Sequence, residues 1–242
     1  MLPFFRKIRY RLAKDNQFFK YSRYAIGEIV LVVIGILIAL QINNWNTDRK
    51  NRKLEKETLS NLKVDLIIQE EIIQRHLNYE KHFLLKVDSA LSMINSKIEI
   101  RKFETLLDSL SRRLTFVSNT VTFENMGLEG NISIISNSDL RKELRKYYQK
   151  LDYTESVINN NNIFRTNNQF GTFVLNNPLG LGLNNTELIE MKYELSPEKR
   201  YILKKQLEGR KYSLLNNIEK CSIQSNSTKI LIALVDKELD EE

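Results

Sequence analysis

The sequence predicts an all-α protein in which one N-terminal transmembrane helix precedes a long-helix bundle or coiled-coil-like domain. Three observations predict this class: an apolar run near the N-terminus, a stretch at residues 47–96 without Gly or Pro, and apolar residues that recur at heptad spacing. They divide the chain into a basic, aromatic cytoplasmic tail (1–24), a transmembrane helix (25–45) and an α-helical extramembrane domain (46–242).

The apolar run covers residues 25–42, reads AIGEIVLVVIGILIALQI and contains one charged residue, Glu28. A helix of this length extends about 27 Å, which is close to the hydrocarbon thickness of a bilayer. We therefore predict that the chain crosses a membrane once. A cleaved signal peptide is disfavoured, because the preceding basic region is long and no A-x-A cleavage site follows the run. The run is interpreted as a signal anchor.

The residues before the run carry most of the chain's net charge. Seven basic residues and one acid, Asp15, give the tail +6 of the total +7. The remainder is nearly neutral, which removes the main electrostatic argument for nucleic-acid binding. The basic side chains either hold the tail in the cytoplasm or, together with its aromatic residues, place a helix on an anionic inner leaflet.

Residues at the two ends of the run predict its boundaries and its orientation. Arg23, Tyr24 and Trp45 are the expected interfacial anchors. The basic excess before the run predicts a cytoplasmic N-terminus in the cell inner membrane, with the bulk of the chain in the periplasm. The bias is slight, because six basic residues also lie within 43–63. The single cysteine, Cys221, excludes an intrachain disulfide and does not identify the compartment.

Two features inside the run suggest a function. Gly27, Gly35 and Ala39 share one helix face, and small residues let two helix backbones approach closely, so this face predicts homo-oligomerisation through the membrane helix. The alternative is that small residues are common in spanning helices. Glu28 is an intramembrane polar residue near the same face. It predicts either ion coupling or a contact with Arg23, headgroup water or a partner helix.

Several short motifs occur together between residues 24 and 46. A Gly-Glu-Ile start at 27–29, an IGILIALQ centre at 34–41 and an Asn-Asn-Trp end at 43–45 follow the basic RKIRYRL tail. In this the chain resembles a family of bacterial single-pass membrane proteins of unknown function. Beyond residue 55 the resemblance rests on a Leu-Arg…Tyr-Tyr element, Leu140, Arg141, Tyr147 and Tyr148. It implies a membrane anchor and an α-helical outer region, and it implies no activity.

The longest predicted extramembrane helix covers about residues 47–98. Two heptad series form its apolar face: Leu59, Leu66, Ile73, Val87 and Ile94 in one, and Leu62, Phe83 and Ala90 in the other. Glu80 interrupts the first series, and Gln69 and His76 interrupt the second. The face is broader than a coiled-coil seam, which favours packing in a bundle. We expect this helix to continue from the transmembrane helix, with a break at Asn43–Thr47 as the alternative.

Three further helices are predicted, over about residues 103–114, 138–165 and 197–239. Asn137 or Ser138 is the expected N-cap of the second, and Ser196-Pro197-Glu198 is a good start signal for the third. The run Asn159–Asn162 is poor helix material and is expected to fray or to reflect codon bias. The polar stretch Ser222–Thr228 predicts a loose or kinked segment in the last helix.

Two stretches are harder to interpret. Residues 115–135 alternate like a strand in part, but we favour a short helix over 122–129 that Gly130 stops, because a lone hairpin would be isolated among helices. Residues 167–195 are predicted to be irregular. Their apolar content argues against disorder and predicts a cap over the bundle end or a partner contact.

Residues that carry chemistry are sparse. His76 and His82 are expected on opposite sides of one helix, so they cannot share a metal ion, and Cys221 lies in an apolar seam. No Gly-rich phosphate loop or catalytic motif occurs. The sequence therefore predicts no catalytic residue, no cofactor and no metal site, and we expect the protein not to be an enzyme.

The favoured hypothesis is a structural or interaction module of the bacterial envelope. Its expected partners are the lipid bilayer, a second copy of the chain and an unknown membrane or envelope protein. The alternative is an extracytoplasmic ligand-sensing subunit that signals through a partner membrane protein. An ion-coupled accessory subunit, which would depend on Glu28, is a further alternative.

Overall fold

The computed structural model describes residues 18–128, 131–176 and 192–241. The chain forms two compact units, residues 1–54 and residues 55–242, and the second is called the bundle below. The described part is mostly helical, which confirms the predicted all-α class. Residues 1–17, which make up most of the predicted tail, lie outside the described residues.

Helix α2 (Phe18–Met93) contributes residues to both units. Its residues 26–54 are all exposed, and the apolar ones among 26–42 have 47–73% of their surface accessible. The helix is unbroken at Asn43–Thr47, where the Thr47 hydroxyl donates a hydrogen bond to the Asn43 carbonyl oxygen (2.9 Å). The expected continuation of the helix is therefore confirmed, and the alternative of a break here is wrong.

The bundle contains the C-terminal part of α2 and the elements that follow it. These are β1 (Ile98–Glu99), α3 (Ile100–Leu110), α4 (Val121–Leu128), the 3₁₀-helix η1 (Asn131–Ile134), α5 (Ser138–Asn161), the π-helix η2 (Asn162–Gly171), α6 (Thr172–Leu175), β2 (Lys192–Tyr193) and α7 (Pro197–Glu241). The predicted short helix at 122–129 matches α4, while Gly130, its expected stop, lies outside the described residues.

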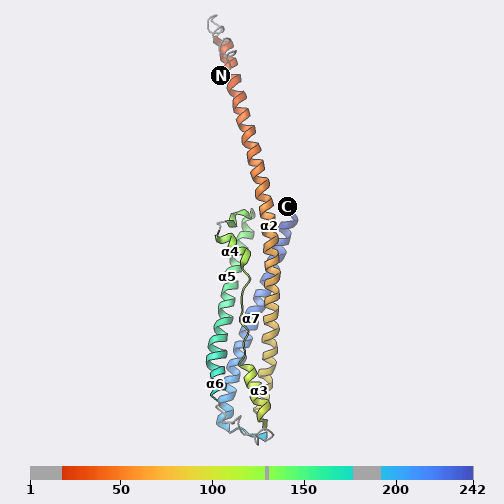
Figure 1. Ribbon diagram of the computed structural model, residues 1–242, viewed down its shortest axis with the longest axis vertical. Helices are drawn as coiled ribbons and strands as arrows, with labels where there is room; N and C mark the ends of the chain where they lie inside the picture. The colour runs from red at the N-terminus through yellow and green to blue at the C-terminus, as the bar shows by residue number, and fades with distance from the viewer. Residues whose placement is uncertain (1–17, 129–130, 177–191, 242) are drawn as a thin grey trace. The chain divides into compact units, whose positions relative to one another are not determined.

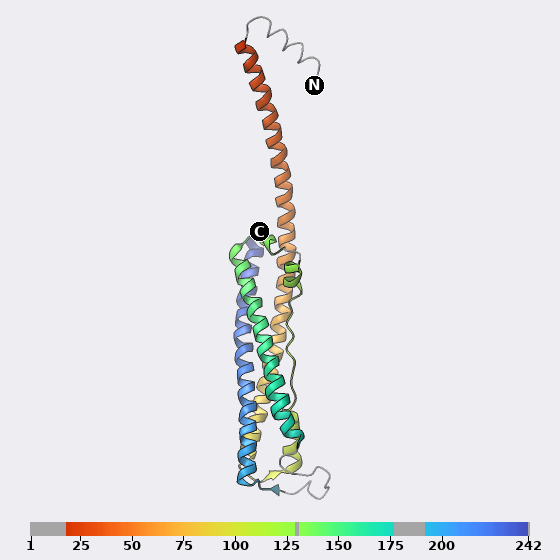
Figure 2. The same ribbon diagram turned by 90° about the vertical axis from the view of Figure 1, so that its left-hand side faces the viewer.

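The long helices of the bundle run alternately up and down (Figure 1). Ion pairs join Lys63 to Asp236 (2.7 Å) and Asp88 to Lys211 (2.7 Å), so α2 and α7 are antiparallel neighbours. Helix α5 is antiparallel to α7 as well, because Tyr147 contacts Thr228 (2.9 Å) whereas Asn161, later in α5, donates to Asn217, earlier in α7 (2.9 Å). The place of a fourth long helix is taken by α3, an extended segment and α4 in succession, which Figure 2 shows from a second side.

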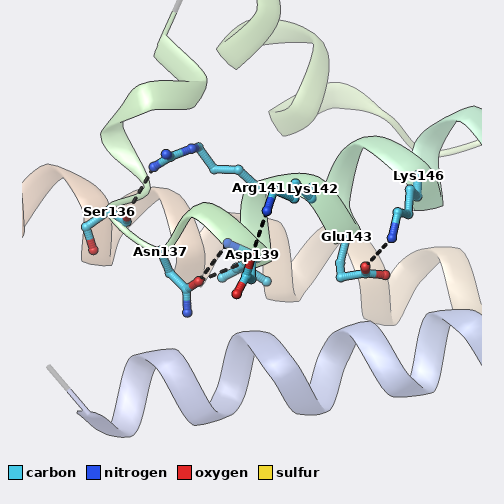
Figure 3. A network of polar contacts seen from close by, with 8 residues as sticks. Ser136, Asn137, Asp139, Arg141, Lys142, Glu143 and Lys146 are labelled. Atoms are coloured by element: carbon cyan, nitrogen blue, oxygen red, sulfur yellow. Dashed lines mark hydrogen bonds and ion pairs between the residues drawn. The ribbon is translucent and has the colours of Figure 1, made fainter.

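The start of α5 follows the capping rules for helices (Figure 3). The Asn137 side chain accepts hydrogen bonds from the backbone N–H groups of Asp139 (3.0 Å) and Leu140 (3.1 Å), so Asn137 is the N-cap. The Arg141 guanidinium donates to the carbonyl oxygens of Ile135 and Ser136, which fixes the chain entering the helix. These contacts explain locally why the helix begins at this position.

Two apolar clusters fill the bundle. The first includes Leu59, Leu66 and Ile73 of α2 together with residues of α5 and the C-terminal half of α7. The second includes Phe83 and Val87 of α2, Ile94 just after it, most of the apolar face of α3 and residues of the N-terminal half of α7. Both heptad series of α2 are buried, as the sequence predicted.

The sequence was less accurate after residue 161. A π-helix and α6 occupy residues 162–175, so the prediction of irregular structure from residue 167 is wrong for residues 167–175; residues 177–191 lie outside the described part. Phe170 is buried in the second apolar cluster, and this packing overrides the weak helix propensity of the neighbouring Asn residues. β1 and β2 form one short antiparallel pair, which pairs Ile98 with Tyr193.

Helix α7 is unbroken through the polar stretch Ser222–Thr228. Ser225 is buried there, and its hydroxyl donates to Glu70 (2.7 Å) and accepts from the Gln74 amide (3.0 Å). The expectation of a loose or kinked segment is therefore wrong: the buried polar side chains in this stretch, Gln224, Ser225 and Thr228, pair with other helices.

Candidate functional site

Residues 111–120, called the strap below, form the most unusual element of the bundle. The strap is extended between α3 and α4 and belongs to no sheet. β-branched residues and a Ser-Asn pair lower its helix propensity, so an extended conformation is locally reasonable. Its backbone polar groups need partners wherever they are buried. Side chains of α2, α5, η2 and α7 supply those partners.

Helix α5 holds one edge of the strap. The Asn159 amide accepts a hydrogen bond from the Phe116 N–H (3.0 Å) and donates one to the Phe116 carbonyl oxygen (2.9 Å), as a neighbouring strand would. The Ser118 N–H donates to Glu155 (3.0 Å). The Phe116 side chain is fully buried in the first apolar cluster. The strap is therefore bound by both its backbone and an apolar anchor.

Helix α2 holds the other edge. The Asn119 N–H donates to Gln69 Oε1 (2.6 Å), and His76 Nε2 lies 3.1 Å from the carbonyl oxygen of Thr115. The His76 ring also lies 4.7 Å from the Phe116 ring, measured between centroids. Gln69 and His76 are the residues that interrupt the second heptad series, and the strap explains their presence in the core.

Helix α7 and the π-helix hold the beginning of the strap. The buried Arg210 guanidinium donates from Nε to the Leu110 carbonyl oxygen (3.1 Å) and from Nη2 to that of Arg112 (3.2 Å). The Asn162 amide donates to the Leu114 carbonyl oxygen (2.9 Å). Asn159, Asn161 and Asn162 all make side-chain hydrogen bonds, so the expected fraying of the Asn run is wrong.

Burial perturbs the titratable groups near the strap. It lowers the pKa of His76, raises that of Glu80 and lowers that of Arg210. Each shift opposes the charged form, because a buried charge loses its hydration. Burial also raises the pKa of the Cys221 thiol to about 12, which keeps the thiol protonated. Cys221 lies in the first apolar cluster, as the sequence predicted.

A groove of about 740 Å³ lies beside the end of the strap. Its lining comes from the strap, α4 and one side of α5: Ser118, Thr120, Phe123, Glu124, Arg145, Tyr148, Gln149, Asp152 and Glu155. Phe123 and Tyr148 stack with their ring centroids 4.0 Å apart. The groove thus combines an aromatic pair with three carboxylates and one guanidinium group.

The residues singled out in and beside the apolar run all lie on α2 and are exposed: Arg23, Tyr24, Gly27, Glu28, Gly35, Ala39 and Trp45. A Cβ atom added to Gly27 or Gly35 would meet no atom within 4 Å. These two positions therefore leave open space for a neighbouring helix. Tyr24 and Trp45, the expected interfacial anchors, are 72% and 61% exposed.

Chemistry-bearing side chains do not converge elsewhere in the part of the chain that the structure describes. His76 is buried whereas His82 is exposed, which agrees with their expected placement on different sides of α2. No group of three or more His, Cys, Asp or Glu side chains among the described residues could hold a metal ion. Sequence analysis missed the strap and its polar partners; the polar interruptions at Gln69 and His76 were the signal that could have found them.

A model of a family of unknown function, DUF6090, matches residues 28–195. The chain belongs to this family. The match includes all but the first three residues of the apolar run, together with the strap and α5, and it does not itself bear on membrane topology. Comparison with curated proteins and with solved structures gives no match.

Proposed function

We propose that this member of the family is a single-pass membrane protein whose bundle acts as an interaction module of the bacterial envelope. The exposure of the apolar run carries the proposal. Its twelve Val, Leu and Ile residues between positions 26 and 42 are all exposed, and helix α2 is long and apolar enough there to cross a membrane. An apolar surface on all sides of a helix is stable in lipid.

The charge pattern supports an orientation for the proposal. The tail carries +6, and the bundle follows the apolar run. A basic segment is retained on the cytoplasmic side, so the bundle would lie in the periplasm. The interfacial positions of Arg23, Tyr24 and Trp45 fit a helix that is anchored at both membrane surfaces.

The proposal assigns binding, and no reaction, to the bundle. Its described residues present a groove, and the exposed Gly27, Gly35 and Ala39 face fits a second copy of the membrane helix. Partners would be the lipid bilayer, another copy of the chain and a membrane or envelope protein. No nucleic acid is expected, because the charge of the chain resides in the tail.

The groove also favours a second candidate function, that of a ligand-sensing subunit. Its aromatic pair and carboxylates could take a small cationic ligand. Such a subunit would pass its signal to a partner membrane protein. Copurification of a transmembrane partner, with ligand-dependent recovery, would separate this candidate from a passive module.

The experiment that tests the proposal combines membrane extraction with topology reporters. Full-length protein should stay in the membrane pellet after alkaline carbonate washing and should keep its N-terminal residues by mass spectrometry. A reporter after Glu242 that is active only outside the cytoplasm should give a signal, and one active only inside should not. Release by carbonate would contradict the anchor, loss of the first 42 residues would show a cleaved signal, and an inside signal would contradict the orientation.

A further inference from the structure

Helix α2 carries a concentrated positive charge directly after the apolar run. Residues 46–54 include four basic residues and one acid, Asp48, which gives this stretch a net charge of +3. The four basic residues are called the basic patch below: Arg49, Lys50, Arg52 and Lys53. All four are exposed. Basic residues on this side of the run weaken the charge bias that orients the chain, so their presence calls for a separate cause.

The basic patch occupies one side of α2, and Trp45 lies on the same side. At 100° of rotation per residue, the four basic residues cover an arc of about 160° that includes Trp45. Asp48 lies outside this arc. The next acid, Glu55, is only 4% exposed and accepts a hydrogen bond from the Ser136 N–H. The patch therefore presents positive charge without a carboxylate within its arc.

The basic patch also lies at the depth of lipid headgroups. Trp45 is the expected interfacial anchor, and the patch extends from about 6 to 12 Å beyond it along the helix. The headgroup layer of one leaflet is about 5–8 Å thick. Side chains on a helix tilt toward its N-terminus, which is here the side of the apolar run. The long Arg and Lys side chains therefore extend back toward the headgroups.

We propose that the basic patch binds the headgroups of anionic phospholipids in the leaflet on the bundle side of the membrane. Such binding depends on the proposed membrane anchor and adds to it a preference for lipid charge. Arg and Lys form charge-assisted hydrogen bonds with phosphate oxygens. A cluster of four or more basic residues beside a spanning helix attracts anionic lipid, whereas a zwitterionic headgroup has no net charge to attract.

Trp45 provides a local probe of this preference. It is the only tryptophan in the chain and lies one turn before Arg49, so its fluorescence reports on the lipid beside the patch. The full chain is placed in vesicles of equal parts phosphatidylglycerol and phosphatidylcholine, with bromine on the acyl chains of one lipid or the other. Brominated phosphatidylglycerol should quench Trp45 more strongly, with a relative affinity about threefold higher. The tail does not contribute, because Arg23 is about 33 Å from Trp45 along the helix, beyond the Debye length.

Two variants separate the charge of the basic patch from its shape. Arg49→Gln with Lys50→Gln and Arg52→Gln brings the net charge of residues 46–54 to zero, so the relative affinity should fall to about one. Arg49→Lys with Arg52→Lys keeps the charge and should keep the preference. Loss of the preference in the Lys variant would contradict binding through charge.

The matched control is Arg101→Gln with Lys102→Gln and Arg113→Gln, which removes three exposed basic side chains from the bundle and should leave the preference unchanged. Equal quenching by the two brominated lipids in the unchanged protein overturns the proposal but retains the anchor, because quenching itself requires contact with lipid. A preference that survives the triple Gln variant of the patch, or is lost in the control, also overturns the proposal. Absence of quenching by either lipid overturns both the lipid preference and the anchor.

Discussion

Residues 26–42 and residues 59–93 belong to one helix, α2, yet they present apolar side chains in opposite ways. In the first region every residue is exposed, whatever its direction around the helix axis. In the second, apolar residues at heptad spacing are buried, and the opposite side of the helix is exposed. A helix that is apolar on all sides needs lipid around it, whereas a striped helix needs other helices on one side.

The comparison also shows how each region tolerates polar residues. In residues 26–42 the one charged side chain, Glu28, lies near the start of the apolar run. The buried face of the second region contains Gln69, His76 and Glu80, each of which hydrogen-bonds the strap or α7. These polar residues can be buried in the bundle because the strap backbone and neighbouring side chains form hydrogen bonds with them.

The largest expected effect comes from charging the first region. Val33→Arg with Leu37→Arg should add roughly 5–7 kcal/mol to the cost of membrane insertion, which offsets the roughly 4–7 kcal/mol contributed by its twelve Val, Leu and Ile residues. We expect the variant to be recovered in the carbonate supernatant. Val33→Leu with Leu37→Val is the matched control and should stay in the pellet. Retention of the Arg variant in the pellet would show that lipid is not the environment of this region.

One substitution placed at three positions of α2 sharpens the comparison. Ile73→Ala should lower the free energy of unfolding of the bundle by about 2–5 kcal/mol, because Ile73 is fully buried. Ile68 lies on the same helix but is exposed, so Ile68→Ala should lower the free energy of unfolding by less than about 1 kcal/mol. Ile34→Ala in the apolar run should leave bundle unfolding unchanged. Urea denaturation in micelles measures all three, and equal losses at Ile73 and Ile68 would contradict the striped packing.

The strap provides the next effect in size. Asn159→Leu removes both hydrogen bonds to Phe116 and leaves the N–H and carbonyl groups of Phe116 unpaired. This should lower the free energy of unfolding by about 2–4 kcal/mol. Asn160→Leu is the matched control, since Asn160 is exposed. Its free energy of unfolding should stay within about 0.5 kcal/mol of that of the unchanged protein. Amide hydrogen exchange at strap residues should accelerate only in the first variant. Equal exchange in both variants would mean that Asn159 does not hold the strap.

The smallest expected effect is a pH dependence of the bundle's stability that results from the titration of His76. Burial lowers its pKa in the folded protein, so the unfolded chain binds the proton more readily. The stability it contributes is full above the unfolded-state pKa of 6.5 and is lost as pH falls through the lower folded-state pKa. The raised pKa of Glu80 acts in the opposite sense, since its buried charge is relieved as pH falls.

The contribution of His76 is isolated by comparing urea midpoints of the unchanged protein and His76→Gln between pH 8 and pH 5. The unchanged protein should lose more stability over this range than the variant does. Parallel midpoints in the two proteins would show that His76 does not titrate in the bundle.

Much of the fold could be predicted from local pattern. The apolar run, the heptad series and the cap at Asn137 each depend on residues close together in the chain, and the structure has the corresponding helices. The strap could not be predicted in this way. Its partners Gln69, Asn159 and Arg210 are 40 or more residues from the groups that they bond. In the sequence each is only a polar residue in a helical segment, and nothing near it in the chain indicates its partner.

The Asn run at 159–162 shows the same limit. By propensity it predicts a frayed helix end, because Asn competes with the backbone for hydrogen bonds. In the bundle Asn159 and Asn162 bond the strap, and Asn161 bonds Asn216 and Asn217 of α7. The helical state of residues 162–175 likewise depends on burial of Phe170 against other elements.

The sequence by itself determined the class of the protein, the position of its apolar run and the faces on which its helices pack, because periodicity and length are local properties of a chain. The tertiary structure decided that an extended strap replaces a fourth long helix. It also decided that buried polar side chains of α2, α5 and α7 serve that strap. Hydrogen-bond partners of buried groups are set by contacts between distant residues, and those contacts exist only after the helices have packed.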